Sequence, residues 1–495
     1  MSLKHETVSG VAWTALSRIV RQLLQFLTVV VLARLLTPED FGLVAMIVVF
    51  TGFATLFVDA GFGAALVQRR ELEERHLSSV FWLNLTVGLA LAAAMALAAP
   101  LVASFYGEPR LKGLTVALSS SFALGAFSVV QLALARRAMD FRRIAWIEIL
   151  SALVAAAVAV FCALRGYGAW ALVAQTLVGA ALLSLTLWLA SAWKPRALFQ
   201  LSAVRELLGF SGNLLGFNAF NYWVRNADNL LIGRFVGSSA LGIYGRAYGV
   251  MLLPLQQVTF VMGQVLFPAL ARIQEDVGRV KDVYLRANRV VALAVFPMVF
   301  GLAVVAEPFV QVVFGPAWLE VAPVLRILCL VALVQPLRAT TSWIYQSRGR
   351  TDLQFLWGVV SGVVTVGAFL IGVRWGVLGC AAAYAIRTYA LLVPGVLVPG
   401  RLIDLSFGAW ARNLGSALAC SLVMALLVWS TSFLLSSSAS PGLRLALQVS
   451  AGVGAYAALV HGARLAAYRE VREILAERRR ARSEPGRDGE SGTGA

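Results

Sequence analysis

Polar side chains form a stripe within the first long apolar segment of the chain, at about residues 9–36. The stripe follows the spacing i, i+4, i+7, i+8 and i+11, which places its members on one face of a helix. These members are Thr14, Arg18, Arg21, Gln22 and Gln25. An arginine at the centre of a membrane-spanning helix costs about 2.5 to 3.5 kcal/mol. Because Arg18 lies roughly 12 Å beyond Gly10 along a helix, it is too deep to reach the membrane interface easily and needs a polar surrounding.

A matching stripe lies in the apolar segment that opens the second half of the chain, at about residues 207–236. Its spacing is i, i+3, i+7 and i+10, and its members are Asn218, Asn221, Arg225 and Asp228. Neither helix can present such a face to lipid, because charged and amide groups are costly there. The sequence therefore predicts that both stripes face water or other parts of the protein.

Two interpretations of these side chains are open. In the first, Arg225 and Asp228 neutralise each other, and Arg18 and Arg21 bind backbone carbonyls as structural links. In the second, which we favour, the stripes line a water-filled cationic cavity that receives an anionic headgroup, because Arg18 and Arg21 have no neighbouring carboxylate in sequence. A further arginine in a later apolar segment is a candidate for the same cavity. The residues expected to bind substrate are Arg18, Arg21, Gln25, Asn218, Asn221, Arg225 and Arg387.

Two carboxylates are candidates for coupling to an ion. Asp59 lies near one end of the second apolar segment, and Asp228 lies in the second stripe. For Asp59, an ordinary residue of a helix interface is the alternative. No motif identifies the ion as H⁺ or Na⁺. No cofactor or metal is expected, since the cysteines lie in apolar runs without C-x-x-C spacing; they are Cys162, Cys329, Cys380 and Cys420.

The composition indicates which elements must position these side chains. The chain has 495 residues, of which 59% are hydrophobic and 14% charged, and its mean hydropathy is +0.79. Soluble domains are about 45–50% apolar and about 25% charged. The sequence therefore predicts an all-α integral membrane protein, with the first apolar segment a spanning helix and not a cleaved signal. Fourteen segments are long enough to span a bilayer, at about residues 9–36, 41–67, 77–105, 111–135, 144–164, 168–192, 207–236, 240–266, 290–306, 321–345, 353–373, 377–399, 414–435 and 443–465.

The distribution of basic residues predicts the orientation. With fourteen spans, the loops on the side of the N-terminus hold 28 of the 42 Lys and Arg residues, the opposite side holds eight, and six lie within spans. Lys and Arg are retained on the cytoplasmic side of inserted helices. Both termini are therefore expected to be cytoplasmic. The formal net charge of +17 is explained by topology, and no nucleic acid partner is expected.

An internal repeat relates the two halves at an offset of 200 residues. Arg34 and Gly42 correspond to Arg234 and Gly242, with similar apolar neighbours. The repeat predicts two six-helix lobes related by a pseudo-two-fold axis along the membrane normal, with a binding site between them. The expected divisions are an N-lobe at 1–206, a C-lobe at 207–400 that includes an amphipathic elbow helix at 268–288, a C-terminal helix pair at 401–467, and a basic tail at 468–495 that is attracted to membrane lipids.

Several motifs together resemble a known family. Residues 32–42 read Leu-Ala-Arg-Leu-Leu-Thr-Pro-Glu-Asp-Phe-Gly, and residues 59–68 read Asp-Ala-Gly-Phe-Gly-Ala-Ala-Leu-Val-Gln. Further motifs occur at residues 228–233 with 241–244, 267–270 and 314–318. In this order and spacing, they are similar to polysaccharide-biosynthesis transporters of the O-antigen and colanic acid exporter type. That family belongs to the multidrug/oligosaccharidyl-lipid/polysaccharide (MOP) exporter superfamily, which includes lipid II flippases.

The resemblance implies a flippase that moves a polyprenyl-diphosphate-linked oligosaccharide across the bacterial cytoplasmic (inner) membrane by alternating access. The product would serve lipopolysaccharide, capsule or exopolysaccharide synthesis. The expected partners are the lipid-linked oligosaccharide and membrane lipids, and a polysaccharide polymerase or assembly protein is a candidate partner. Arginine suits the diphosphate, because its planar fork binds phosphate oxygens in pairs.

Two rival functions come from other classes. A multidrug exporter shares the superfamily, but the arginine stripe and the extra helix pair argue against it. A polytopic polysaccharide polymerase or ligase is the less favoured alternative, because the predicted outer loops are short. The sequence has no H-E-x-x-H or phosphate-binding loop motif. We therefore do not expect an enzyme.

Overall fold

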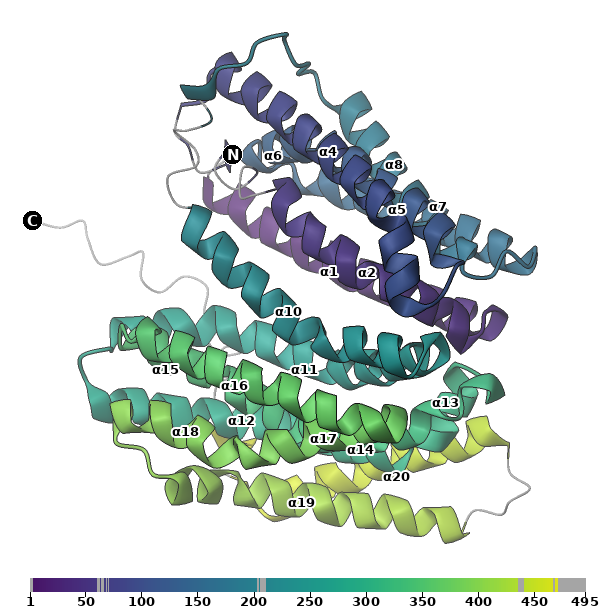
Figure 1. The fold of residues 1–495 in the computed structure, drawn as a ribbon. Helices are drawn as coiled ribbons and strands as arrows, with labels where there is room; N and C mark the ends of the chain where they lie inside the picture. Colours follow the sequence, from purple (N-terminus) through teal and green to yellow (C-terminus); the bar gives the residue numbers. More distant parts are fainter. Residues whose placement is uncertain are drawn as a thin grey trace, which may run out of the picture. The chain divides into compact units, whose positions relative to one another are not determined.

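The computed structural model describes residues 3–59, 63, 66, 67, 69, 71–202, 204, 211–434, 440–465 and 468–470. Every regular element in these ranges is helical (Figure 1). The chain divides into two compact units. The first consists of residues 1–245, 313–318 and 369–380, and the second consists of 246–312, 319–368 and 381–495.

The first unit is built from helices that pack in pairs. Within it, α4 packs on α5, α7 on α8, α1 on α7, and α10 on α2. Apolar side chains fill the contacts, including the fully buried Phe81 and Val80 of α4. Its helices are α1 (Leu3–Leu35), α2 (Pro38–Asp59), α4 (Glu74–Tyr106), α5 (Leu111–Ala126), α6 (Val129–Arg137), α7 (Phe141–Leu164), α8 (Trp170–Ala190) and α10 (Ser211–Phe235), together with the first turns of α11.

In the second unit, α12 packs on α14 and α19, and α19 packs on α20. Polar contacts add to this packing, because Asn413 of α19 donates to the carbonyl oxygen of Leu285 at 2.8 Å. The helices of this part of the chain are α11 (Ser238–Arg272), α12 (Val277–Val304), α13 (Ala306–Val313), α14 (Val321–Ala339), α15 (Thr341–Ser347), α16 (Thr351–Gly372), α17 (Gly376–Ala390), α18 (Leu392–Gly400), α19 (Phe407–Leu434) and α20 (Pro441–Gly462). Short 3-10 turns occur at Pro316–Trp318, Val373–Trp375 and Arg401–Ile403.

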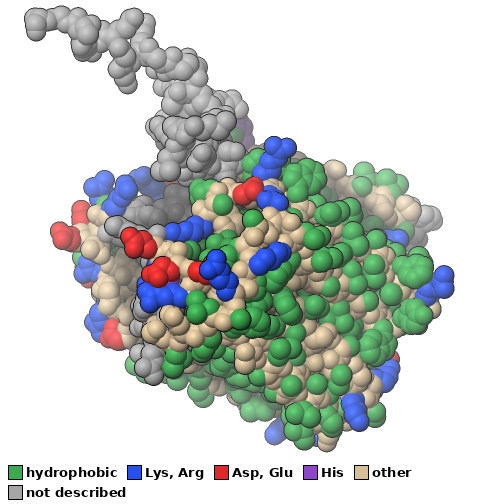
Figure 2. Space-filling view, turned by 90° about the horizontal axis from the view of Figure 1, so that it is seen from above, with side chains coloured by type: hydrophobic (Ala, Val, Ile, Leu, Met, Phe, Trp, Pro, Cys, Tyr) green, Lys and Arg blue, Asp and Glu red, His purple; other side chains and the backbone are tan. Residues whose placement is uncertain are grey.

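The length and surface of the helices show an integral membrane protein. Eleven helical stretches of the described residues are long and apolar enough to cross a bilayer. Large apolar side chains are widely exposed, such as Leu97 at 80% and Leu189 at 78%. Figure 2 shows hydrophobic side chains over broad parts of one face. A surface of this kind is stable in contact with lipid, where helices satisfy their own backbone hydrogen bonds.

Three of the predicted spans are each divided into two helices in the structure. The segment 111–135 was expected to be one helix, but it is divided into α5 and α6 at Phe127 and Ser128. The segment 321–345 is likewise divided into α14 and α15 at Thr340. The segment 377–399 is divided into α17 and α18 at Leu391. Hydropathy cannot detect such breaks, because the residues on both sides remain apolar.

The separate elbow helix expected at 268–288 is not what the structure contains. Its first part belongs to the end of α11, and residues from Val277 onward begin α12, which continues through the apolar segment to Val304. Asp276 causes this division, because its side chain accepts a hydrogen bond from the backbone N–H of Arg279 at 2.9 Å and so caps the new helix. The basic tail expected at 468–495 lies almost entirely outside the described residues.

Two glycines of the sequence repeat meet in a reciprocal contact within the first unit. The helices α2 and α11 begin at Pro38 and Ser238, which are 200 positions apart. Gly42 of α2 packs against the backbone carbonyl of Ser238, and Gly242 of α11 packs against the backbone carbonyl of Pro38. A side chain at either glycine would overlap the opposite carbonyl. The shared glycine is therefore required by the close approach of the two helix beginnings.

Motifs that are distant in sequence also meet in this unit. Trp318 is fully buried, and its indole N–H donates to the carbonyl oxygen of Ala33 at 2.7 Å. Its ring packs edge-on against Phe41, with centroids 5.3 Å apart. The residues of the motifs at 32–42 and 314–318 therefore form one structural contact.

Candidate functional site

The arginine stripe of α1 lies beside a carboxylate supplied by another helix. Nη1 of Arg21 lies 3.1 Å from Oε2 of Glu148 on α7. The Arg21 side chain is 43% exposed, whereas that of Glu148 is 18% exposed. The absence of a neighbouring carboxylate in sequence was therefore misleading for Arg21, because helix packing supplies one. The signal that could have found it is Glu148 itself, an acidic residue within the apolar segment 144–164.

Two further members of this stripe lie on the accessible surface of α1. Arg18 and Gln25 are exposed, and Gln22 is half-buried. The side chain of Thr14 lies outside the described residues. Arg18, Arg21 and Gln25 therefore keep polar groups accessible along one helix, with Arg21 held in place by Glu148.

The second stripe, on α10, separates into an exposed and a buried part. Asn218, Asn221 and Arg225 are exposed, whereas Asp228 is buried at 6% exposure. Asp228 accepts a hydrogen bond from the hydroxyl of Tyr244 at 3.0 Å and another from the backbone N–H of Asn229 at 2.8 Å. Among the described residues, Arg225 forms no ion pair with it. The carboxylate thus links α10 to α11, and the Arg225 guanidinium stays accessible.

Aromatic side chains fix which face of α10 is accessible. The hydroxyl of Tyr222 donates to the carbonyl oxygen of Val49 on α2 at 2.8 Å. The ring of Trp223 lies against Phe53 of α2, with centroids 4.9 Å apart. Since these two residues face α2, Asn221 and Arg225 point away from it on the helical wheel.

In the second unit, Arg387 is buried, with 8% exposure. Its Nη2 donates to the backbone oxygen of Ser361 on α16 at 2.8 Å and lies 3.2 Å from the hydroxyl oxygen of the same residue. Arg338 of α14 lies near enough for the two positive charges to repel each other. Neither arginine forms an ion pair within the described part of this unit.

Of the two candidate ion-coupling residues, Asp228 has a described side chain. Asp228 is a single buried carboxylate with a tyrosine hydroxyl and a backbone amide as partners. The side chain of Asp59 lies outside the described residues. Within the ranges that the structure describes, no group of three or more His, Cys, Asp or Glu residues could hold a metal ion.

The sequence is similar to those of known proteins of polysaccharide biosynthesis. Residues 31–323 match the family described as "Polysaccharide biosynthesis protein". The chain is 28% identical over 466 residues to the teichuronic acid biosynthesis protein TuaB of Bacillus subtilis (strain 168), covering 92% of this chain and 95% of that protein. It is 32% identical over 363 residues to the succinoglycan biosynthesis transport protein ExoT of Rhizobium meliloti (strain 1021), covering 73% and 74%. It is also 28% identical over 379 residues to the lipopolysaccharide biosynthesis protein WzxC of Escherichia coli (strain K12), covering 75% and 76%.

Solved structures show the same fold at low sequence identity. The lipid II flippase MurJ in an inward closed conformation aligns with a TM-score of 0.73 and 15% identity, covering 91% of this chain and 98% of that one. An inward-facing multidrug resistance MATE family transporter of the MOP superfamily aligns with a TM-score of 0.62 and 15% identity, covering 78% and 96%. The chain thus shares its fold with these two membrane proteins, and the match over more than half of the sequence shows that the chain belongs to the polysaccharide biosynthesis protein family.

Proposed function

We propose that the protein is a flippase that moves a polyprenyl-diphosphate-linked oligosaccharide across the bacterial cytoplasmic membrane for the synthesis of O-antigen, capsule or exopolysaccharide. The observation that carries the proposal is the row of accessible Arg18, Arg21 and Gln25 on α1, a helix whose segment from Leu16 to Leu35 is apolar enough to cross a membrane. Family membership and the names of the relatives, among them a succinoglycan transport protein, support the substrate class.

The chemistry of the substrate explains why arginines are needed at this depth. A sugar diphosphate cannot cross hydrocarbon unaided, whereas a polyprenyl tail can remain in lipid. Arg18, Arg21 and Arg225 would bind the diphosphate oxygens, and Gln25, Asn218 and Asn221 would exchange hydrogen bonds with sugar hydroxyls. Arg387 would add positive charge from the second unit. Glu148 would orient Arg21 while leaving part of its guanidinium accessible to substrate.

The proposed mechanism is alternating access between two six-helix lobes within a fourteen-helix protein, with both termini in the cytoplasm. Asp228 is the proposed coupling carboxylate, because it is buried and bonded to Tyr244 at the junction of α10 and α11. Asp59 is a second candidate for coupling. A polysaccharide polymerase or assembly protein is the proposed partner, and no enzymatic step is assigned to this chain.

Multidrug export is the second candidate function, because the fold also matches a MATE transporter. The two functions differ in the charge that the substrate requires. A cationic drug is repelled by accessible arginines, whereas a diphosphate is attracted. The exposed Arg18, Arg21 and Arg225 therefore favour the anionic glycolipid.

Alanine substitution of these arginines tests the proposal. Loss of a charge-assisted phosphate contact weakens binding by roughly 1.5 to 3 kcal/mol, so Arg18→Ala, Arg21→Ala and Arg225→Ala should each strongly reduce surface polysaccharide at normal membrane abundance. Lysine should restore export only partly, because it lacks the paired donors. Arg165→Ala is the control, since Arg165 is an exposed residue beyond the end of α7. Wild-type export by a stably inserted triple alanine variant would refute the proposed site.

A further inference from the structure

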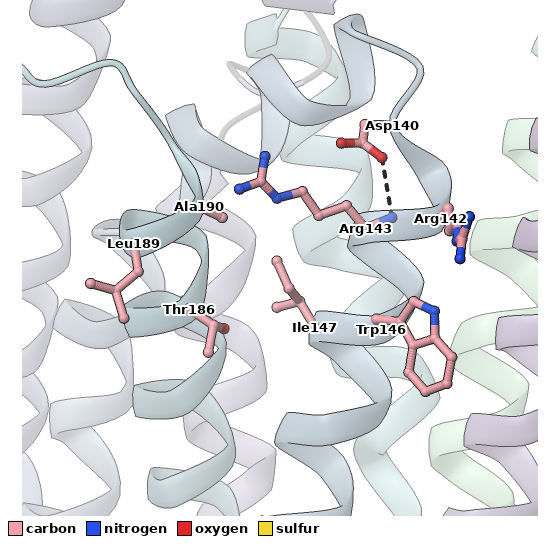
Figure 3. A pocket seen from close by; sticks show the side chains of 8 residues that line it. All are labelled: Asp140, Arg142, Arg143, Trp146, Ile147, Thr186, Leu189 and Ala190. Atoms are coloured by element: carbon pink, nitrogen blue, oxygen red, sulfur yellow. Dashed lines mark hydrogen bonds between the residues drawn. The ribbon is translucent and has the colours of Figure 1, made fainter.

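A pocket of about 500 Å³ opens between the beginning of α7 and the end of α8, outside the proposed transport site. Figure 3 shows the Arg143 side chain extending from α7 toward the end of α8 at Ala190. The lining residues are Asp140, Arg142, Arg143, Trp146, Ile147, Thr186, Leu189 and Ala190. All of them belong to the first unit.

A second, more enclosed chamber of about 170 Å³ adjoins this pocket. The two share Asp140, Arg143, Ile147 and Ala190 in their walls. The chamber is also lined by Gln131 of α6, which is 2% exposed. Neither the amide nitrogen nor the amide oxygen of Gln131 has a hydrogen-bond partner among the described residues. A buried amide of this kind requires a polar partner, because leaving it unpaired is costly.

We propose that this pocket binds the headgroup of an anionic glycerophospholipid, of the phosphatidylglycerol type, from the surrounding bilayer. The pocket lies where a lipid of the bilayer can reach it. Both α7 and α8 are candidate membrane spans. Trp146, which lines the pocket, is 58% exposed, and about one turn further along the two helices Leu150 is 54% and Leu185 is 55% exposed. Acyl chains can lie against this surface while the headgroup enters the pocket. Tryptophan and arginine together are typical of the level where headgroups lie.

The charge of the pocket lining suits an anionic headgroup. Arg143 has an exposed side chain that forms no ion pair among the described residues, and it is one of the residues that line both chambers. The Arg142 guanidinium extends away from that of Arg143 (Figure 3), with its carbon 5.5 Å from the ring centroid of Trp13 on α1. Arg143 is therefore the guanidinium placed to bind a phosphodiester, and Arg142 adds positive charge nearby. Asp140 is the single carboxylate of the lining, and its Oδ1 accepts a hydrogen bond from the backbone N–H of Arg143 at 3.2 Å. Because the lining also holds two arginines, its net charge is positive.

The polar groups of the lining also suit hydroxyl groups in the part of the headgroup beyond the phosphate. Asp140 would repel the second negative charge of a free phosphate monoester, but a glycerol hydroxyl can donate to its carboxylate. The amide of Gln131 can both donate and accept, which matches a hydroxyl group. A choline headgroup offers neither O–H nor N–H donors. The lining therefore favours a phosphodiester that carries hydroxyl groups.

Native mass spectrometry of the purified full-length protein in detergent tests this assignment. The protein is titrated with dioleoyl phosphatidylglycerol, phosphatidylethanolamine or phosphatidylcholine, and separately with sn-glycerol 1-phosphate. Phosphatidylglycerol should bind about tenfold more tightly than the other two lipids. Equal binding of all three lipids would overturn the headgroup assignment. Equally tight binding of glycerol phosphate would show a site for a soluble phosphate, and the lipid assignment would be wrong.

Two variants locate the binding within the molecule. Arg143→Gln should lower the affinity for phosphatidylglycerol about tenfold, whereas Arg136→Gln, which removes an exposed arginine of α6 that does not line the pocket, should not. Gln131→Leu should leave the melting temperature in lipid-free detergent unchanged or higher, because an unpaired amide is removed, but it should reduce the preference for phosphatidylglycerol. Unchanged affinity in Arg143→Gln, or an unchanged lipid preference in Gln131→Leu, would refute the proposal.

Discussion

The reciprocal packing of Gly42 and Gly242 makes a quantitative prediction about stability. In Gly242→Ala, the new methyl carbon would lie 2.8 Å from the carbonyl carbon of Pro38, with the oxygen closer still. In Gly42→Ala, the corresponding distance to the carbonyl carbon of Ser238 is 2.5 Å. The obstructing atoms are backbone, so no side chain can rotate away. The beginnings of α2 and α11 would have to separate.

The cost follows from two opposing effects. Forcing an extra methyl into a packed contact costs about 1–3 kcal/mol, and overlap with a backbone carbonyl group places each substitution near the upper end. Alanine gains about 0.5–1 kcal/mol over glycine in a helix interior. Each substitution should therefore destabilise the folded protein by about 2 kcal/mol. Gly249→Ala on the same helix is a matched control, because no atom lies within 4 Å of its added carbon, and it should be neutral or stabilising.

Thermal stability of the purified variants, followed by the loss of the monodisperse peak in size-exclusion chromatography, measures the effect. Gly42→Ala and Gly242→Ala should melt below the wild type, and Gly249→Ala should not. The double alanine variant should cost less than the sum of the single variants, because one separation of the helices relieves both contacts. Stability of Gly242→Ala equal to that of Gly249→Ala, or strict additivity of the pair, would show that this reasoning is wrong.

Three further predictions concern polar groups and topology. Exchanging the charges of the α1–α7 pair, with Arg21→Glu and Glu148→Arg together, should restore the membrane abundance that either single change lowers, but it should not restore export, which surface polysaccharide assays measure. The hydrogen bond from Arg110 holds the pKa of Glu108 below its usual range, so its small stabilising contribution is present at neutral pH and is lost as the pH falls through the lowered value. The melting-temperature difference between wild type and Arg110→Gln should therefore be present at pH 6 and should become smaller as the pH is lowered. Reporter fusions should place Arg75 in the cytoplasm and Glu108 outside, and the reverse result would refute the proposed orientation.

The sequence predicted the features that depend on local periodicity and hydropathy. The accessibility of Arg18, Arg21 and Gln25 follows from their spacing on one helix, and the helical, membrane-spanning class follows from hydropathy. The pairing of Arg21 with Glu148 could not be predicted, because it depends on which helix packs beside α1. The same holds for Asp228, whose partner Tyr244 lies on the next helix.

Other features depend on geometry that hydropathy does not encode. The division of 268–288 between α11 and α12 depends on the cap formed by Asp276, a single residue inside an amphipathic pattern. The offset of 200 residues predicted that Gly42 and Gly242 are equivalent, but it did not show that each packs on the start of the other's helix. The joint cavity of Arg18, Arg21, Arg225 and Arg387, and the coupling role of Asp59, stay predictions.

The crossing of α2 and α11 also bears on how such a chain could arise. Gly42 packs on Ser238 at the start of α11, and its equivalent Gly242 packs on Pro38 at the start of α2. Such a reciprocal contact has the form of an isologous interface, as in a two-fold symmetric dimer. A half-length ancestor that paired with a copy of itself would make both contacts with one glycine codon. After duplication and fusion, the two codons would be independent, but the contact would still require both glycines. This crossing would therefore retain glycine at both positions while the surrounding helices diverge.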